Sequence, residues 1–128
     1  MKRILVCGGR DFGNTLEERK YIFKELDAHA EKYSSEDFLP TDFTLICGMA
    51  PGVDMVAYDW AITNWVPIEE YPANWDKHKK RAGIIRNKLM LTEGEPTVVI
   101  AFRGGEGTKN MVRIATRAGL PVIIPNKM

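Results

Sequence analysis

The chain has 128 residues, 45% of them hydrophobic and 27% charged, and its formal net charge is +1. That length suits a single domain over residues 1–128 that buries its own core. The near-neutral charge argues against nucleic acid or anionic lipid as a partner. The apolar stretches are too short for a signal peptide or a membrane span, so we expect a cytoplasmic protein without membrane contact.

The first half of the chain alternates strand and helix patterns. We expect a strand over 3–7 and then a helix that starts near Asn14 or Thr15, because Thr15 and Glu18 have the spacing of a capping box. A polar loop over 34–41 leads to a second strand over 43–47, and a second helix starts near Gly52. The side chains expected to form the apolar faces are Leu16, Ile22, Phe23, Leu26, Ala30 and Tyr33 in the first helix and Val53, Val56, Ala57, Trp60 and Ala61 in the second.

The second half continues the same alternation. A third strand over 67–71 mixes polar and apolar residues, which is typical of a sheet edge, and a basic segment over 77–81 leads into a third helix. A fourth strand over 97–102 is the most apolar and therefore the best candidate for the sheet centre. A fourth helix over 107–118 stops at Gly119, before a fifth strand over 121–124. The expected apolar residues are Ile84, Ile85, Leu89 and Met90 in the third helix and Met111, Ile114, Ala115 and Ala118 in the fourth.

This alternation predicts an α/β fold. We expect one Rossmann-like domain of three layers, in which a mainly parallel five-stranded sheet lies between two layers of helices. The expected strand order is 3-2-1-4-5, with right-handed crossovers. In that order the chain changes direction between strands one and four, so the loops after these two strands flank the crevice in which such folds bind ligands.

Three of the apolar runs end in glycine-rich turns, at residues 8–11, 48–54 and 104–108. Glycine lets a ligand approach the backbone closely, and the N–H groups at the start of a helix favour a phosphate. Because all such turns lie at one edge of a parallel sheet, we expect them to form a single site for a nucleotide or a nucleotide-derived ligand. The chain lacks the P-loop pattern and the Gly-x-Gly-x-x-Gly pattern, which argues against a P-loop nucleotidase and against ordinary dinucleotide binding.

Polar side chains in and near these turns are candidate site residues. Arg10 offers a planar fork for phosphate and Asp11 can accept from a ribose hydroxyl or a base amine; a surface ion pair or a simple turn is the alternative. Asp54 either orients a ligand or caps the second helix, and Thr108 either donates its hydroxyl or caps the fourth. The expected ligand-binding residues are Gly8, Gly9, Arg10, Asp11, Gly48, Asp54, Arg86, Asn87, Gly104, Gly105, Gly107 and Thr108.

Other residues admit both a functional and a structural interpretation. Apolar neighbours surround Arg86, so we expect its charge to point at a specific partner, whereas the basic run over 77–88 is more typical of a solvated face. Tyr71 and Trp75 could form a stacking wall for a base or pack in the core or a lid. Cys7 and Cys47 end buried strands and are expected to be small core residues, with a redox pair as the alternative. We expect no metal site, because no zinc-ligand spacing is present.

Taken together, the stretches GGRDF (8–12), GMAPGVD (48–54), YPANW (71–75), AGIIRN (82–87) and AFRGGEGT (101–108) resemble the YspA-related (cpYpsA-like) branch of the SLOG superfamily. That superfamily also includes the LOG phosphoribohydrolases and the DNA-processing protein A family. The resemblance implies a Rossmann-like domain that binds nucleotides or nucleotide-derived ligands. It matches Arg86 to the functional arginine of LOG enzymes and residues 104–108 to their phosphate loop.

Two departures from the family pattern bear on function. LOG enzymes carry glutamates just after the glycine–threonine pair, one of them catalytic, and this chain has Lys109, Asn110 and Met111 there. The branch usually has glycine where this chain has Lys79.

Three functions therefore remain open. The first is a nucleotide-binding or sensor domain without catalysis. The second is a nucleoside-monophosphate N-glycosidic hydrolase, for which the candidate catalytic residues are Arg86, Asp11, Asp54 and Glu106. The third, binding of single-stranded DNA along the basic run, is the least favoured because the chain is near neutral. The resemblance also implies a homo-oligomer, and the second helix with Trp60 and Trp65 is the expected contact face.

Overall fold

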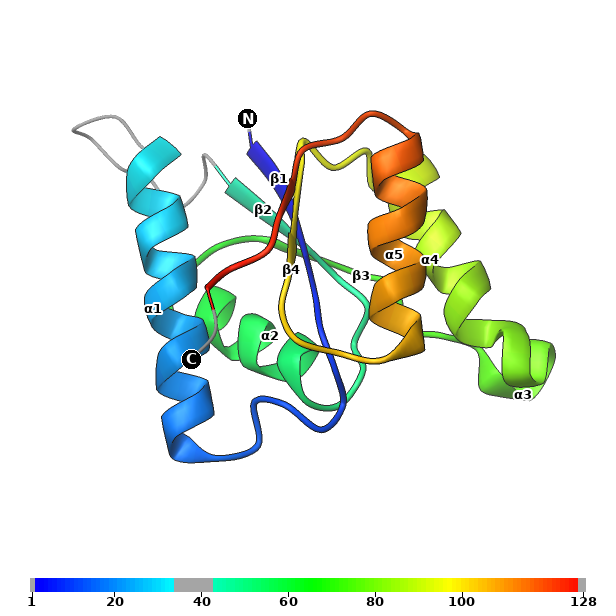
Figure 1. Ribbon diagram of the computed structural model, residues 1–128, viewed down its shortest axis with the longest axis horizontal. Coiled ribbons are helices and arrows are strands. Elements are labelled where there is room, and N and C mark those ends of the chain that lie inside the picture. Colours follow the sequence, from blue (N-terminus) through cyan, green and yellow to red (C-terminus); the bar gives the residue numbers. More distant parts are fainter. Residues whose placement is uncertain (1, 34–42, 127–128) are drawn as a thin grey trace.

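The computed structural model describes residues 2–33 and 43–126, and it is drawn in Figure 1. The loop expected over 34–41 and the side chain of Tyr33 lie outside the described residues. The strands are β1 (Lys2–Cys7), β2 (Phe43–Cys47), β3 (Ile68–Glu70), β4 (Val98–Ala101) and β5 (Val122–Ile123). The helices are α1 (Leu16–Tyr33), α2 (Val53–Thr63), α3 (Trp75–His78), the 3₁₀ turn η2 (Lys79–Arg81), α4 (Ala82–Thr92) and α5 (Glu106–Arg117).

The five strands are all parallel and form one sheet in the order β3-β2-β1-β4-β5, which confirms the predicted topology. The expectation that the most apolar strand lies at the centre was wrong. β4 is internal, but β1 occupies the middle and pairs with both β2 and β4. An apolar strand is one that is buried on both faces of the sheet. Because β2 is as fully buried as β4, apolar composition alone does not tell which internal strand lies in the middle.

Two helical layers cover the sheet, α1 and α2 on one face and α4 and α5 on the other (Figure 1). The pleat of β1 divides its side chains between them: Ile4 and Val6 face the first layer, and Leu5 and Cys7 face the second. Cys47 packs with Val6 on the first face, so the two cysteines lie on opposite sides of the sheet. Both are free and buried, which confirms the core interpretation and excludes the redox pair.

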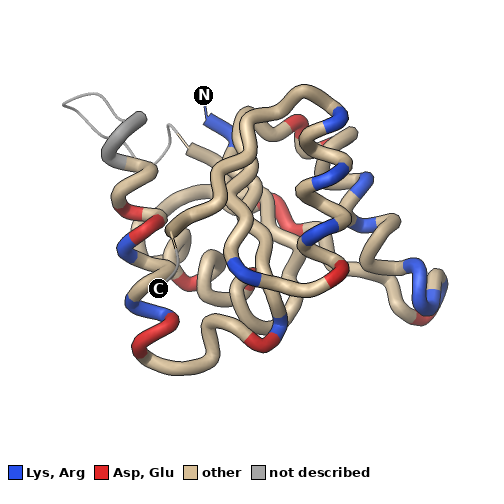
Figure 2. Tube along the Cα trace, viewed as in Figure 1, with Lys and Arg blue, Asp and Glu red and all other residues tan. Residues whose placement is uncertain are grey.

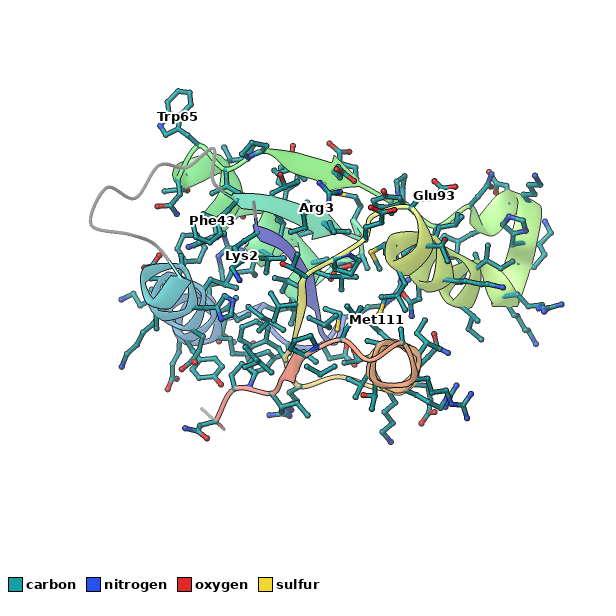
Figure 3. The ribbon with its side chains drawn as sticks, turned by 90° about the horizontal axis from the view of Figure 1, so that it is seen from above. Lys2, Arg3, Phe43, Trp65, Glu93 and Met111 are labelled. Atoms are coloured by element: carbon teal, nitrogen blue, oxygen red, sulfur yellow. The ribbon has the colours of Figure 1, made fainter. Side chains whose placement is uncertain are left out.

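The helices bury most of the side chains that their spacing predicts. In α2 all five expected residues are buried, and in α5 Met111 is fully buried and points toward the sheet in Figure 3. The predictions for α4 were partly wrong, because its buried residues are Ala82, Asn87 and Met90, which places Ile84 and Leu89 on the outer side. Leu16 and Ala118 are also exposed, since each lies at the end of its helix.

The contact face proposed for an oligomer needs correction. Trp60 is only 2% exposed, and its indole N–H donates a hydrogen bond to Asp27 on α1 at 2.8 Å, so it joins two helices of the same chain. Trp65, which follows α2, is 84% exposed and points away from the body of the molecule in Figure 3. Among the described residues, no helix combines the length and the apolar character needed to cross a bilayer.

The start of α1 is a reciprocal capping box, as predicted. The Thr15 hydroxyl accepts from the Glu18 backbone N–H at 3.1 Å, and the Glu18 carboxylate accepts from the backbone N–H groups of Gly13, Asn14 and Thr15. These bonds, that from Asn14 foremost, lower the pKa of Glu18. The box therefore fixes the point at which the chain leaves the turn after β1 and enters α1.

Removing the Thr15 hydroxyl should destabilise the start of α1. Thr15→Ala should lower the free energy of unfolding by about 1 kcal/mol, because one N–H at the start of the helix loses its partner. Thr15→Ser keeps the hydroxyl and serves as the control, with a loss well below that of the alanine variant. Chemical denaturation measures both, and equal losses in the two variants would contradict this role of the hydroxyl.

Candidate functional site

The three glycine-rich turns meet at the carboxyl edge of the sheet, at the lower side of the view in Figure 1. The backbone N–H of Gly9 donates to the carbonyl of Arg103 at 2.8 Å, and the carbonyl of Gly9 accepts from the Val53 N–H at 3.2 Å. A pocket of about 430 Å³ opens between the turns. Its lining comes from the segments after β1, β2 and β4 and from α4: Cys7, Gly8, Gly9, Arg10, Asp11, Phe12, Ala50, Asp54, Arg86, Asn87, Met90, Arg103, Gly104, Gly105, Glu106, Gly107 and Thr108.

One wall of the pocket is the first turn of α5. The first intrahelical bond runs from the Lys109 N–H to the Gly105 carbonyl, so the N–H groups of Glu106, Gly107 and Thr108 precede the hydrogen-bonded part of the helix. Gly105 is the N-cap residue and has no side chain to occupy these donors. A Cβ added at Gly105 or Gly107 would meet nothing within 4 Å, so the approach to this turn is open.

Thr108 does not cap α5, because the helix begins at Glu106 and Thr108 is its third residue. Its hydroxyl lies against Gly104 instead. A Cβ at Gly104 would come within 2.2 Å of the Thr108 Oγ1 and within 2.7 Å of the Gly9 nitrogen. The close contact of the two turns therefore depends on the absence of a side chain at Gly104.

Asn87 holds the first turn of α5 in position. Its side chain is 4% exposed, and its amide nitrogen donates to the Gly107 carbonyl at 3.1 Å and to the Asn110 side-chain oxygen at 3.0 Å. Its own side-chain oxygen accepts from the Arg86 Nε at 3.1 Å. Asn87 thus links α4 to α5, and its polar atoms are occupied by the protein itself.

Arg86 projects from α4 toward the turn after β2. Its Nη1 donates to the carbonyl of Gly48 at 2.5 Å, so the charge has a specific partner within the chain, one that the sequence did not identify. Burial lowers the pKa of this guanidinium, although nearby Asp54 opposes the shift. Gly48 itself is absent from the pocket lining, so in this structure its backbone supports Arg86 rather than facing the cavity.

Asp54 supplies a buried carboxylate to the pocket. It lies in the first turn of α2, is 6% exposed, and its Oδ2 accepts from the Ala50 backbone N–H at 3.1 Å. Burial raises its pKa to about 6, against the opposing effects of the Ala50 hydrogen bond and of Arg86. The capping alternative was wrong, because the N-cap residue of α2 is Gly52 and no side chain makes a cap hydrogen bond there. The Asp54 carboxylate bonds instead to the loop that precedes α2, and it also lines the pocket.

Four charged residues lie at the rim of the pocket. Arg10, Asp11, Arg103 and Glu106 are all exposed. The Arg10 guanidinium lies 5.2 Å from the centre of the Trp75 ring, and the Arg103 guanidinium lies 5.6 Å from that of Phe12. Glu106 pairs with Lys109 at 3.5 Å in a solvent-exposed contact, which contributes little to stability.

Arg103 is the charged residue of the pocket that the sequence did not lead us to expect, and the uncharged Cys7, Phe12, Ala50 and Met90 were not expected there either. It directly precedes the glycine turn after β4, and its carbonyl accepts from Gly9 while its side chain lines the pocket. A basic residue immediately before a glycine-rich turn at the end of a buried strand was the available signal. Including it, three arginines (Arg10, Arg86 and Arg103) and three carboxylates (Asp11, Asp54 and Glu106) line the cavity.

The basic run forms a separate surface beside the pocket. Figure 2 shows basic residues along α3, η2 and α4, and Lys77, Lys79, Lys80, Arg81 and Lys88 are all exposed, as expected of a solvated face. Within it Lys79 has a φ of 54° and a ψ of −130°, a backbone conformation that favours glycine. The glycine that the family resemblance led us to expect here would adopt this conformation without strain.

The buried Asp54 carboxylate should make stability depend on pH. Its pKa is raised in the folded protein, from 3.8 to about 6, so the folded state binds the proton more tightly and stability falls as the pH rises through this window. Asp54→Asn removes the titration and retains an oxygen for the Ala50 N–H. The stability of the wild type relative to this variant should fall by up to about 3 kcal/mol between about pH 4 and about pH 7. Denaturation at a series of pH values measures it, and a difference that does not vary with pH would contradict the burial of an ionisable group here.

Comparisons with known proteins agree with this architecture. A family model described as "YspA, cpYpsA-related SLOG family" matches residues 2–78, from β1 to the end of α3. The chain is also similar to the Gene 61 protein of Mycobacterium phage D29. The two are 32% identical over 133 residues, which cover 96% of this chain and 95% of the phage protein. The chain therefore belongs to the YspA, cpYpsA-related SLOG family.

Proposed function

We propose that this protein binds a nucleotide or a nucleotide-derived ligand and acts as a binding or sensor domain. One observation carries the proposal: turns from three separate segments meet around one pocket whose wall is the open first turn of α5. The N–H groups of that turn and the positive end of the helix dipole favour a phosphate. Family membership supports a nucleotide-related role at the coarse level.

The charges of the pocket fit a ligand that carries both a phosphate and hydrogen-bond donors. Arg10 and Arg103 are exposed at the rim, where a guanidinium can form paired bonds to phosphate oxygens. The carboxylates of Asp11 and Asp54 can accept from ribose hydroxyls or a base amine. A bare inorganic anion would use the first group and leave the second without a role.

Binding without catalysis is favoured by the residues that follow the glycine turn. LOG enzymes use a glutamate in this stretch, and here Asn110 is buried against Asn87 while Met111 is fully buried in the core. Lys109 is exposed and pairs with Glu106. None of the three provides a carboxylate for attack at a sugar.

A variant of Gly105 tests the proposal without disturbing the fold. Its φ is −96° and a Cβ there meets nothing, so Gly105→Asp is sterically allowed. The new carboxylate would cap the first turn of α5 and compete with the ligand phosphate for the same N–H groups. We expect the melting temperature to stay the same or rise and the affinity for nucleotides to fall about tenfold or more, because like charges repel.

The assay is a panel of nucleotides and nucleotide second messengers in differential scanning fluorimetry, with calorimetry for the ligands that bind. Ile62→Asp adds the same charge at an exposed position near the far end of α2 and should leave binding unchanged. Absence of binding by the wild type across the panel, or equal loss in both variants, would refute a phosphate site at this helix.

A second function, hydrolysis of the N-glycosidic bond of a nucleoside monophosphate, is favoured by one feature. Asp54 is a buried carboxylate in the pocket with a pKa of about 6, close to the value that suits acid–base chemistry near neutral pH. If the protein is a hydrolase, Asp54→Asn should abolish the release of free base from monophosphates while binding persists, as followed by chromatography of the products. Base release that survives in both Asp54→Asn and Arg86→Ala would remove this pocket as its source.

A further inference from the structure

We propose that the base of the ligand stacks on the indole of Trp75, and that it does so in place of the Arg10 guanidinium, which lies over this ring in the structure. The inference rests on the proposed nucleotide site and assigns the part of that site that binds the base. The phosphate would lie at the glycine turns and the base would stack on Trp75, which is not itself part of the pocket lining.

Trp75 is a large apolar side chain exposed beside a polar pocket. It is 47% exposed, and it is the first residue of α3, whose N-cap residue Asn74 accepts from the Lys77 N–H at 3.1 Å. The cap fixes the backbone from which the indole projects. Tyr71, the other aromatic candidate, is partly buried against the core, and its hydroxyl bonds to Glu69 at 3.0 Å, so it has a structural role.

Gly83 lies beside both Trp75 and Arg86. A Cβ built on Gly83 would lie 3.7 Å from the Trp75 Cη2 and 3.9 Å from the Arg86 Nη2. The edge of the indole and the guanidinium of a pocket residue therefore approach the same bare position on the first turn of α4. A ligand that leaves the pocket past Arg86 would reach the indole directly.

Arg10 spans the gap between the phosphate turns and the indole. Its backbone follows Gly9, which contacts Gly104, and its guanidinium lies 5.2 Å from the centre of the Trp75 ring. One arginine side chain thus reaches from the glycine turns toward the indole. Arg10 is also exposed, so it is free to turn.

Replacement of the Arg10 guanidinium by the base favours binding in two ways. A base stacked on an indole is held more strongly than a guanidinium in an exposed cation–π contact. The displaced guanidinium turns toward the phosphate and gains charge-assisted hydrogen bonds. Stacking accepts every base but increases with ring area, so we expect adenine and guanine nucleotides to bind more tightly than pyrimidine nucleotides.

The test compares a nucleotide with the same phosphate sugar lacking the base. Trp75→Leu should weaken binding of a purine nucleoside monophosphate about tenfold or more and change the affinity for ribose 5-phosphate less than twofold. Trp75→Phe retains an aromatic face and should restore part of the affinity. Trp65→Leu removes the other exposed tryptophan and should change neither.

Fluorescence gives an independent reading. A stacked base should quench tryptophan emission in the wild type and in Trp65→Leu, and the quenching should disappear in Trp75→Phe. Nucleotide affinity unchanged in Trp75→Leu would overturn the inference and leave the phosphate site intact. Equal weakening of nucleotide and ribose 5-phosphate would also overturn the inference, because the loss would then not involve the base. Failure of the wild type to bind either ligand would refute the proposed function and this inference together.

Discussion

The backbone of Gly9 is the constraint on which the pocket depends. Its N–H donates to the carbonyl of Arg103 after β4 and its carbonyl accepts from the N–H of Val53 at the start of α2, so one residue joins three segments that are distant in sequence. The two residues packed against this backbone, Gly52 and Gly104, must both be glycine. A Cβ at Gly52, whose φ is +84°, would lie 2.3 Å from the Gly9 carbonyl oxygen, and one at Gly104 would lie 2.7 Å from its nitrogen. Much of the glycine content of the turns therefore serves the contact between them, and the bare residues at the start of α5 are the ones left to face a ligand.

The interior of the site keeps two opposite charges close without joining them. Asp54 and Arg86 influence each other electrostatically, yet each hydrogen-bonds to backbone, one to the Ala50 N–H and the other to the Gly48 carbonyl. Both groups border the position that a side chain at Gly48 would take, since a Cβ there would be 2.7 Å from the Arg86 Nη1 and 3.0 Å from the Asp54 Oδ2. Such an arrangement leaves part of the bonding capacity of both groups for a ligand.

The sequence was sufficient for the architecture and for the edge at which the turns gather. The alternation of strands and helices predicted the strand order, and the spacing of Thr15 and Glu18 predicted the capping box, because both patterns depend on local chemistry. What the sequence could not show was which way individual side chains face. Periodicity did not reveal that Ile84 and Leu89 face outward, because the buried face of α4 includes the polar Asn87. Similarly, the pairing of Asn87 with Asn110 and of Arg86 with Gly48 joins residues whose separation in sequence carries no pattern.

The backbone of Lys79 gives the segment between α3 and α4 a further property. A side chain at a φ of 54° restricts this joint to far fewer conformations than a glycine would allow, at the expense of local strain. Trp75 lies four residues before the joint, at the other end of α3. If a base stacks on Trp75 as proposed, a stiffer connection would already hold the indole in its orientation, so less entropy would be lost on binding.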